Sequence, residues 1–236
     1  MELYSPTEYL KGAVLAVQEY TLLAVRSIAN LFRQPRYFAD TIQQSDIIGV
    51  GSLPIVVLTG FFTGAVLALQ TSSTLQQFGS LSLIGQLVSF SMVRELGSMQ
   101  VTEQIDAMRA LGTDPTKKLV TPRVVASVVM MFFLTIISDM LGVVGGFVMS
   151  FFVLGLDANQ YWASSYQKLQ YDDIEMGLVK PLLFGFVIAT VGCYYGLTAK
   201  GGTQGVGRAT TQAVVTASVL ILLVDLLITR LLMVLT

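Results

Sequence analysis

Long apolar runs separated by short polar segments dominate the chain after its first 46 residues. Residues 47–93 contain no charged side chain. Within them, residues 49–69 approach the roughly 20 residues that an α-helix needs to cross a bilayer. A polar, uncharged loop follows at 71–80, and the next apolar run, 81–93, is shorter than a usual span. The pattern predicts one full transmembrane helix and a second that is truncated.

Two further apolar runs and the last stretch of the chain complete the pattern. The run 124–156 contains one charged residue, Asp139, and is also interrupted by Gly142, Gly145 and Gly146. Because it exceeds one span, this helix must tilt, bend or project beyond the membrane. The remaining segments are predicted to be a polar loop at 157–180, a span at 181–199, a flexible Gly-rich cytoplasmic turn at 200–212 and a last span at 213–236. The fold class is therefore an all-α membrane protein with about five transmembrane helices.

The first 46 residues have a different pattern. Apolar residues recur at helical spacing up to about Leu31, and the opposite face carries both signs of charge. This is typical of an amphipathic helix, which could lie in the membrane interface or pack on the protein itself. We expect the interface. The chain then divides into an N-terminal interfacial helical segment, 1–46, and a transmembrane domain, 47–236.

Composition narrows the function classes. The chain is 53% hydrophobic and 12% charged, whereas soluble domains carry about 25% charged residues. Soluble enzymes and disordered chains are therefore excluded as first interpretations, and a net charge of −1 gives no attraction to nucleic acid. The absence of histidine excludes His-based catalysis and His-metal sites. The single cysteine, Cys193, excludes an intrachain disulfide.

The basic residues predict the orientation. If 81–93 crosses the membrane, one side receives the four Lys and Arg of the N-terminal segment, the five of residues 94–123 and the two of residues 200–212. On the opposite side, residues 71–80 contain no Lys or Arg, and residues 157–177 contain only Lys168. By the positive-inside rule, the N-terminus is cytoplasmic and the C-terminus lies outside.

One cytoplasmic loop contains a short amphipathic helix. Its apolar positions are spaced by four, three and three residues and form one stripe: Val101, Ile105, Met108 and Leu111. Gly112 is placed to end this helix, and Pro115 prevents its resumption. This apolar stripe must be buried against another surface. The surface could be a groove on a soluble partner, the chain's own helices or the lipid interface.

A few residues within the spans are candidates for packing or transport. Gly60 and Gly64 form a GxxxG pair, which permits close helix approach. Asp139 and Asp225 lie within apolar runs, where ionisable groups are costly and mark candidate functional sites. Arg230 is five residues from Asp225, which is not an ideal helix-face spacing. Pairing with another helix is an equally good explanation for these charges.

Four motifs, in order along the chain, carry a family resemblance: Arg94 to Gly97, Val101 to Met108, Leu111 to Pro115 and Gly205 to Thr211. Together they resemble the MlaE/YrbE-type permeases, the membrane subunits of lipid-transporting ABC systems. The resemblance implies a multi-pass protein of the bacterial inner membrane that forms a homodimer. It also implies binding to a cytoplasmic ABC ATPase and to an MCE-domain lipid-binding protein.

The family's coupling helix, which inserts into a groove on the ATPase, matches residues 102–112 within the loop 98–121. The resemblance therefore assigns ATPase docking to this helix, and the expected residues are Val101, Glu103, Ile105, Asp106, Met108, Leu111, Gly112 and Asp114. The chain has no ATPase motif of its own, so ATP is expected to be used by the partner. We expect no cofactor and no metal on this chain.

The sequence departs from the family pattern after Gly97. In the family, a Pro and an apolar stretch follow Arg-Glu-Leu-Gly, and a second Glu-Leu-Gly-like element precedes the coupling helix. Here Gly97 continues directly into Ser98. The missing stretch is about one span, roughly 20 residues, which explains the short second helix. The residues do not distinguish a natural from an introduced loss.

The sequence therefore predicts a transport subunit and not an enzyme: an ABC permease that moves phospholipid or a related lipid. Two alternatives remain. An intramembrane lipid-acting enzyme would need Asp139 and Asp225 as a pair, although no flanking motif supports one. An ion-coupled secondary transporter would carry internal repeats, and none is convincing.

Overall fold

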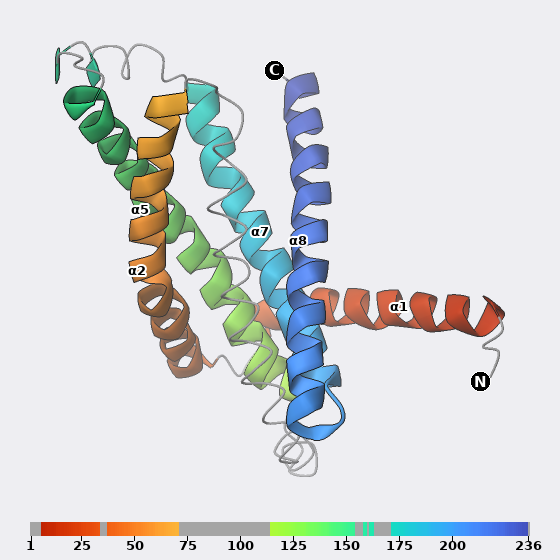
Figure 1. The fold of residues 1–236 in the computed structure, drawn as a ribbon. Coiled ribbons are helices and arrows are strands. Elements are labelled where there is room, and N and C mark those ends of the chain that lie inside the picture. The colour runs from red at the N-terminus through yellow and green to blue at the C-terminus, as the bar shows by residue number, and fades with distance from the viewer. Residues whose placement is uncertain are drawn as a thin grey trace.

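The computed structural model describes residues 6–33, 37–70, 114–153, 158–159, 161–162 and 171–235. All regular structure in these ranges is helical, which confirms the all-α fold class. The elements are α1 (Pro6–Leu31), α2 (Phe38–Gln70), the short π-helix η1 (Thr116–Val120), α5 (Thr121–Phe152), α7 (Tyr171–Thr198) and α8 (Gly202–Leu235). Figure 1 shows α2, α5, α7 and α8 as a bundle, with α1 lying across it.

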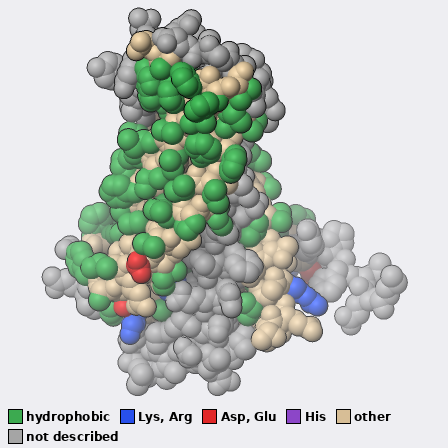
Figure 2. All heavy atoms as spheres, turned by 60° about the vertical axis from the view of Figure 1, so that its left-hand side comes forward, with side chains coloured by type: hydrophobic (Ala, Val, Ile, Leu, Met, Phe, Trp, Pro, Cys, Tyr) green, Lys and Arg blue, Asp and Glu red, His purple; other side chains and the backbone are tan. Residues whose placement is uncertain are grey.

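Four helical segments are long and apolar enough to cross a membrane: Phe38–Val66, Thr116–Met149, Gly177–Thr198 and Gly202–Leu231. The chain is thus a multi-pass membrane protein. The truncated span predicted at 81–93 lies outside the described residues. Figure 2 shows hydrophobic side chains over most of the described surface on the α2–α5 side, with charged side chains toward its lower end.

The N-terminal helix ends at Leu31, as its pattern predicts. Its second half contacts η1, α5 and α7, and Ser27 is fully buried there. The first half exposes Leu10, Val14 and Val17. The contact with η1 places the N-terminal segment and the end of loop 94–123 at one end of the bundle, whereas the C-terminus lies at the other (Figure 1). The N-terminal segment and the C-terminus thus lie toward opposite ends of the bundle in Figure 1.

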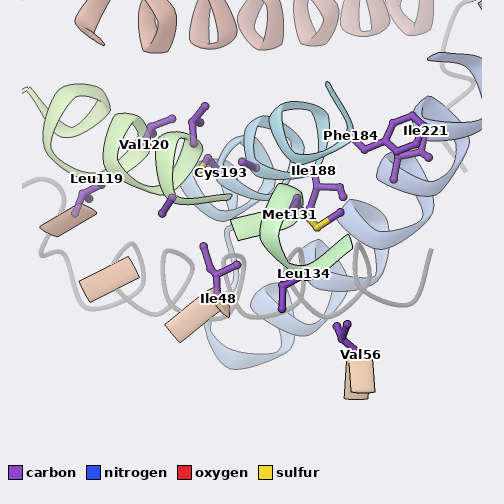
Figure 3. Packing of buried hydrophobic residues seen from close by; sticks show 13 residues of the cluster. Ile48, Val56, Leu119, Val120, Met131, Leu134, Phe184, Ile188, Cys193 and Ile221 are labelled. Carbon is purple, nitrogen blue, oxygen red and sulfur yellow. The ribbon is translucent and has the colours of Figure 1, made fainter. Parts of the chain in front are cut away.

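The core lies between α2, α5 and α7. Met131 and Leu134 of α5 pack with Ile188 of α7 and Val56 of α2, and all four are at most 2% exposed. Figure 3 shows these side chains converging between the helices. Close packing of this kind fixes the relative positions of three spans.

The last helix is covered least by the rest of the chain. Only 6% of its apolar window is buried, against 33–56% for the other three spans. Its buried residues include the small side chains Ala209, Ala213 and Ala217 and, farther along, Ile221. Most of the apolar surface of α8 therefore faces outward.

Two predicted loops are in part helical. The prediction of a loop at 157–180 is wrong for the last ten residues, because α7 begins at Tyr171 and includes Lys180. The flexible turn predicted at 200–212 is also wrong, because α8 begins at Gly202. The connection is confined to residues 199–201, and the φ angles of Gly201 and Gly202 at its end, 93° and 66°, are in the left-handed region. Two glycines suffice to reverse the chain since they adopt this region without steric cost.

Candidate functional site

An ion pair joins the last two spans. The Lys180 ammonium on α7 lies 2.8 Å from the Asp225 carboxylate on α8, and both side chains are largely buried, at 8% and 16% exposed. Lys180 also donates a hydrogen bond of 3.0 Å to the Thr229 hydroxyl, one turn further along α8. Asp225 thus pairs with another helix and not with Arg230, which is exposed on α8.

Lys180 was missed as a site residue because the polar stretch before it led to its assignment to a loop. Its own neighbours carry a usable signal: it directly precedes Pro181 and an apolar run that contains no further charge before Lys200. A lone cation next to a span requires a counter-charge, and Asp225 is the complementary lone anion in the last span.

Asp139 lies in the α5 span with an exposed side chain. Within the described part of the chain it forms no ion pair with Lys180 or Arg230. The helices α5 and α8 each pack on α7, and the Asp225 carboxylate is already bound to Lys180. The structure therefore does not form the Asp139–Asp225 pair that an aspartyl-type enzyme would need.

A seam of glycines brings α2 and α5 into close contact. A Cβ atom on Gly60 would lie 2.7 Å from the backbone oxygen of Ser138, and one on Gly64 would collide with the backbone of Gly142. From the other side, a Cβ on Gly145 would collide with the backbone of Phe61. The contacts advance in the same direction along both helices, so α2 and α5 are parallel. The GxxxG pair thus lies at a backbone-to-backbone helix contact.

Hydroxyl groups attach α1 to the bundle. Thr190 of α7 donates to the carbonyl of Phe186, so the bond of 2.9 Å between Tyr20 and Thr190 uses the Tyr20 hydroxyl as donor. The Tyr20 ring also packs edge-on against Tyr194. Burial raises the pKa of Tyr20 above its ordinary value of 10.0.

Asp114 is the one predicted docking residue within the described ranges. It is exposed, and its carboxylate accepts a hydrogen bond of 2.9 Å from the backbone N–H of Thr116. Asp followed by Pro115 is a favoured start for a helix, so Asp114 caps the element that leads into α5. The other predicted docking residues lie outside the described residues: Val101, Glu103, Ile105, Asp106, Met108, Leu111 and Gly112.

Comparison with known proteins identifies the family. The family model described as "Permease MlaE" matches residues 41–98 and 95–231, which is most of the chain. The chain belongs to the MlaE permease family. Members of this family are membrane subunits of ABC transporters, so the chain is an ABC transporter permease and a transport subunit.

Named relatives agree with this assignment. A probable ABC transporter permease protein of Rickettsia typhi is 39% identical over 234 residues, covering 90% of each chain. The chloroplastic protein trigalactosyldiacylglycerol 1 of Arabidopsis thaliana is 30% identical, covering 94% of this chain and 68% of the relative. The intermembrane phospholipid transport system permease protein MlaE of Haemophilus influenzae is 29% identical. The alignment covers 82% of this chain and 83% of the relative.

The match to the MlaE family is divided where the sequence departs from the family pattern. The two matched segments overlap at residues 95–98, directly around Gly97. The alignment with the Rickettsia typhi permease spans 234 positions but takes up only 90% of the 236 residues here. It therefore includes positions at which this chain has no residue, as a missing stretch would require.

Proposed function

We propose that this MlaE-family permease moves phospholipid or a related lipid across or out of the bacterial inner membrane. The observation that carries the proposal is the family match over residues 41–98 and 95–231. The name of the Haemophilus influenzae relative, a phospholipid transport permease, supports the substrate class.

The surface chemistry of the bundle suits a lipid substrate. The outward face of α8 exposes Val215, Val219 and Leu222, and farther along Leu226. The charges of the last two spans include a neutralised pair, Lys180 with Asp225. An ion path would need polar groups open to water, whereas an acyl chain needs a continuous apolar surface.

Energy comes from a separate ATPase in this proposal. The ATPase docks on the 102–112 helix through the stripe of Val101, Ile105, Met108 and Leu111, and uses the ATP. Closure of the ATPase pushes on this helix, and the push passes through Asp114 and η1 into α5, since these elements are consecutive along the chain. A homodimer of the permease and an MCE-domain partner complete the assembly.

Reconstitution tests the proposal. The permease is co-expressed with the ATPase and MCE-domain protein from its own source and placed in vesicles with a headgroup-labelled phospholipid. We expect transfer of the labelled lipid to require ATP and to stop when the ATPase carries an inactivating substitution. Transfer that proceeds without ATP would contradict the proposal.

An ionophore serves as the control for the secondary-transport alternative. Collapsing the proton and sodium gradients leaves an ATP-driven permease unaffected and stops an ion-coupled one. Replacing Asp139 with Asn provides the second control, because it removes one member of the proposed carboxyl pair and leaves the Lys180–Asp225 ion pair intact. Loss of lipid hydrolysis with transfer retained would indicate an intramembrane enzyme.

A further inference from the structure

A cluster of aromatic side chains caps the end of α5 that is farther from α1. Tyr161 and Trp162 come from the connection between α5 and α7 and pack on Phe147 of α5, with ring centroids 5.5 and 5.6 Å from it. Phe151 stacks on Phe147 from the next turn, at 5.8 Å. We call these four residues the aromatic cap.

The connection is fastened to α5 at a defined depth. The Tyr161 hydroxyl donates a hydrogen bond of 2.9 Å to the carbonyl of Val143. The absence of a side chain at Gly146 makes room for it, because a Cβ there would lie 2.8 Å from the hydroxyl. Val143 and Phe147 belong to the last turns of the candidate span Thr116–Met149. The cap therefore lies where this span ends.

The outward face of α5 continues from the span into the cap. Phe133 and Met140 are 52% and 67% exposed within the span, so they face hydrocarbon or another apolar surface, and Phe151 and Phe152 are 45% and 76% exposed just beyond it. No charged residue occurs among the described residues from 143 to 162. A protein partner is commonly selected by charge around an apolar centre, and the described cap offers none.

We infer that the aromatic cap is a lipid-contacting anchor that holds the end of α5 at the boundary between hydrocarbon and headgroups. Tyrosine and tryptophan favour this boundary because their rings are apolar and their O–H or N–H groups are polar. The anchor is a contact with the bulk bilayer and does not depend on the proposed transport activity. It fixes the membrane depth of α5 and, through it, of the packed core.

Trp162 makes the inference directly testable because it is the single tryptophan of the chain. The full-length permease is reconstituted into vesicles containing lipids brominated either near the headgroup or near the end of the acyl chain. Fluorescence is excited where tyrosine does not absorb. We expect the shallow label to quench Trp162 about twofold more than the deep label, as for a residue at the interface.

A tryptophan at the middle of the same helix provides the matched control. Phe133 lies midway along the α5 span and is exposed, so the variant F133W/W162F carries its only tryptophan at that depth. The deep label should quench this variant more than the shallow one. The quenching of Trp162 is measured on the unaltered chain. That measurement therefore remains valid even if the variant does not fold.

Three results would overturn the inference. Equal or stronger quenching of Trp162 by the deep label would place it in the hydrocarbon. Quenching by aqueous iodide but by neither brominated lipid would place it in water. Protection from lipid and aqueous quenchers alike would indicate that protein covers the cap.

Discussion

Lys180 and Asp225 neutralise each other across the interface between α7 and α8, 2.8 Å apart and largely buried. Removing either partner would leave one buried charge in a span, and an unpaired buried charge is far more costly than an apolar side chain. The pair explains why both helices tolerate a charge in an otherwise apolar stretch. It also adds an ionic link between two spans that otherwise meet through apolar packing and a hydrogen bond of 2.9 Å between the Tyr195 and Thr216 hydroxyls.

We therefore expect Asp225→Asn to destabilise the permease by about 3–5 kcal/mol, the usual cost of breaking a buried pair. The double variant K180M/D225L should recover most of this loss because it removes both charges and keeps the volume. Thermal unfolding in detergent, followed by the remaining monodisperse protein, measures both. Arg230→Gln is the control, since Arg230 is exposed. A double variant as unstable as the single one would contradict the pairing.

Gly64→Ala should separate α2 from α5, because the new methyl group would meet the backbone of Gly142, which no side-chain rotation can move. Overpacking typically costs about 1–3 kcal/mol, and contact with backbone places Gly64 at the upper end. Gly51→Ala is the matched control on the same helix, as nothing lies within 4 Å of its Cβ position. Equal melting temperatures for the two variants would show that the seam is not a close contact.

Tyr20→Phe should loosen α1, because it deletes the hydroxyl that donates to Thr190 and keeps the ring against Tyr194. A single hydrogen bond contributes about 0.5–1.5 kcal/mol. Hydrogen exchange of α1 amides should accelerate by about tenfold, since 1.4 kcal/mol corresponds to that factor. Exchange in α5 serves as the internal control. If the α1 amides of the variant exchange at the unaltered rate, the hydroxyl does not hold α1, and the packing of the Tyr20 ring against Tyr194 is sufficient.

The same tyrosine predicts a dependence on pH. Burial raises the pKa of Tyr20 in the folded chain above 10.0, so the folded state holds this proton more tightly than the unfolded state. Its contribution to stability is complete below pH 10 and is lost as the pH rises through the folded pKa. Exchange of α1 in the natural chain should therefore accelerate above pH 10. Tyr20→Phe should lack this component, and an identical pH profile in both would contradict it.

The docking helix can be tested through its apolar stripe. Ile105→Asp and Met108→Asp should abolish co-purification of the ATPase, because a charge on the stripe cannot enter an apolar groove. Ala110→Asp adds the same charge on the opposite face of the helix and should leave co-purification intact. If all three variants retain the ATPase, the helix is not its binding site.

Hydrophobic patterning predicts much of the fold because each span is set by its own composition. The spacing of apolar residues was sufficient to predict α1, and the length of an apolar run was sufficient to predict α5. Local hydropathy could not assign Lys180 to a helix, because a lysine indicates a loop unless its counter-charge on another helix is known. The start of α8 failed for a related reason: residues 202–212 are Gly-rich, but Val206 and Ala209 are packed within the bundle.

The candidate site was predictable in part. The charge at Asp225 was identified from its apolar surroundings, and its partner was not. The GxxxG pair marked a close contact, but only the packing identifies Ser138, Gly142 and Gly145 as its counterpart. Tyr20 gave no signal at all, because one tyrosine in an amphipathic helix is indistinguishable from any other without the hydroxyl it meets.

The parallel packing of α2 and α5 determines where the end of α2 and the start of α5 lie in the bundle. Both helices run away from the α1 end, so the chain leaves α2 at one end of the bundle and enters α5 at the other. Gln70 and Asp114 therefore lie at opposite ends of the bundle. A change in the length of the connection has to preserve this separation, or α5 would be inverted relative to α2. An inverted α5 would lose the glycine seam, since Gly60 and Gly64 could no longer meet Ser138 and Gly142 in the same order.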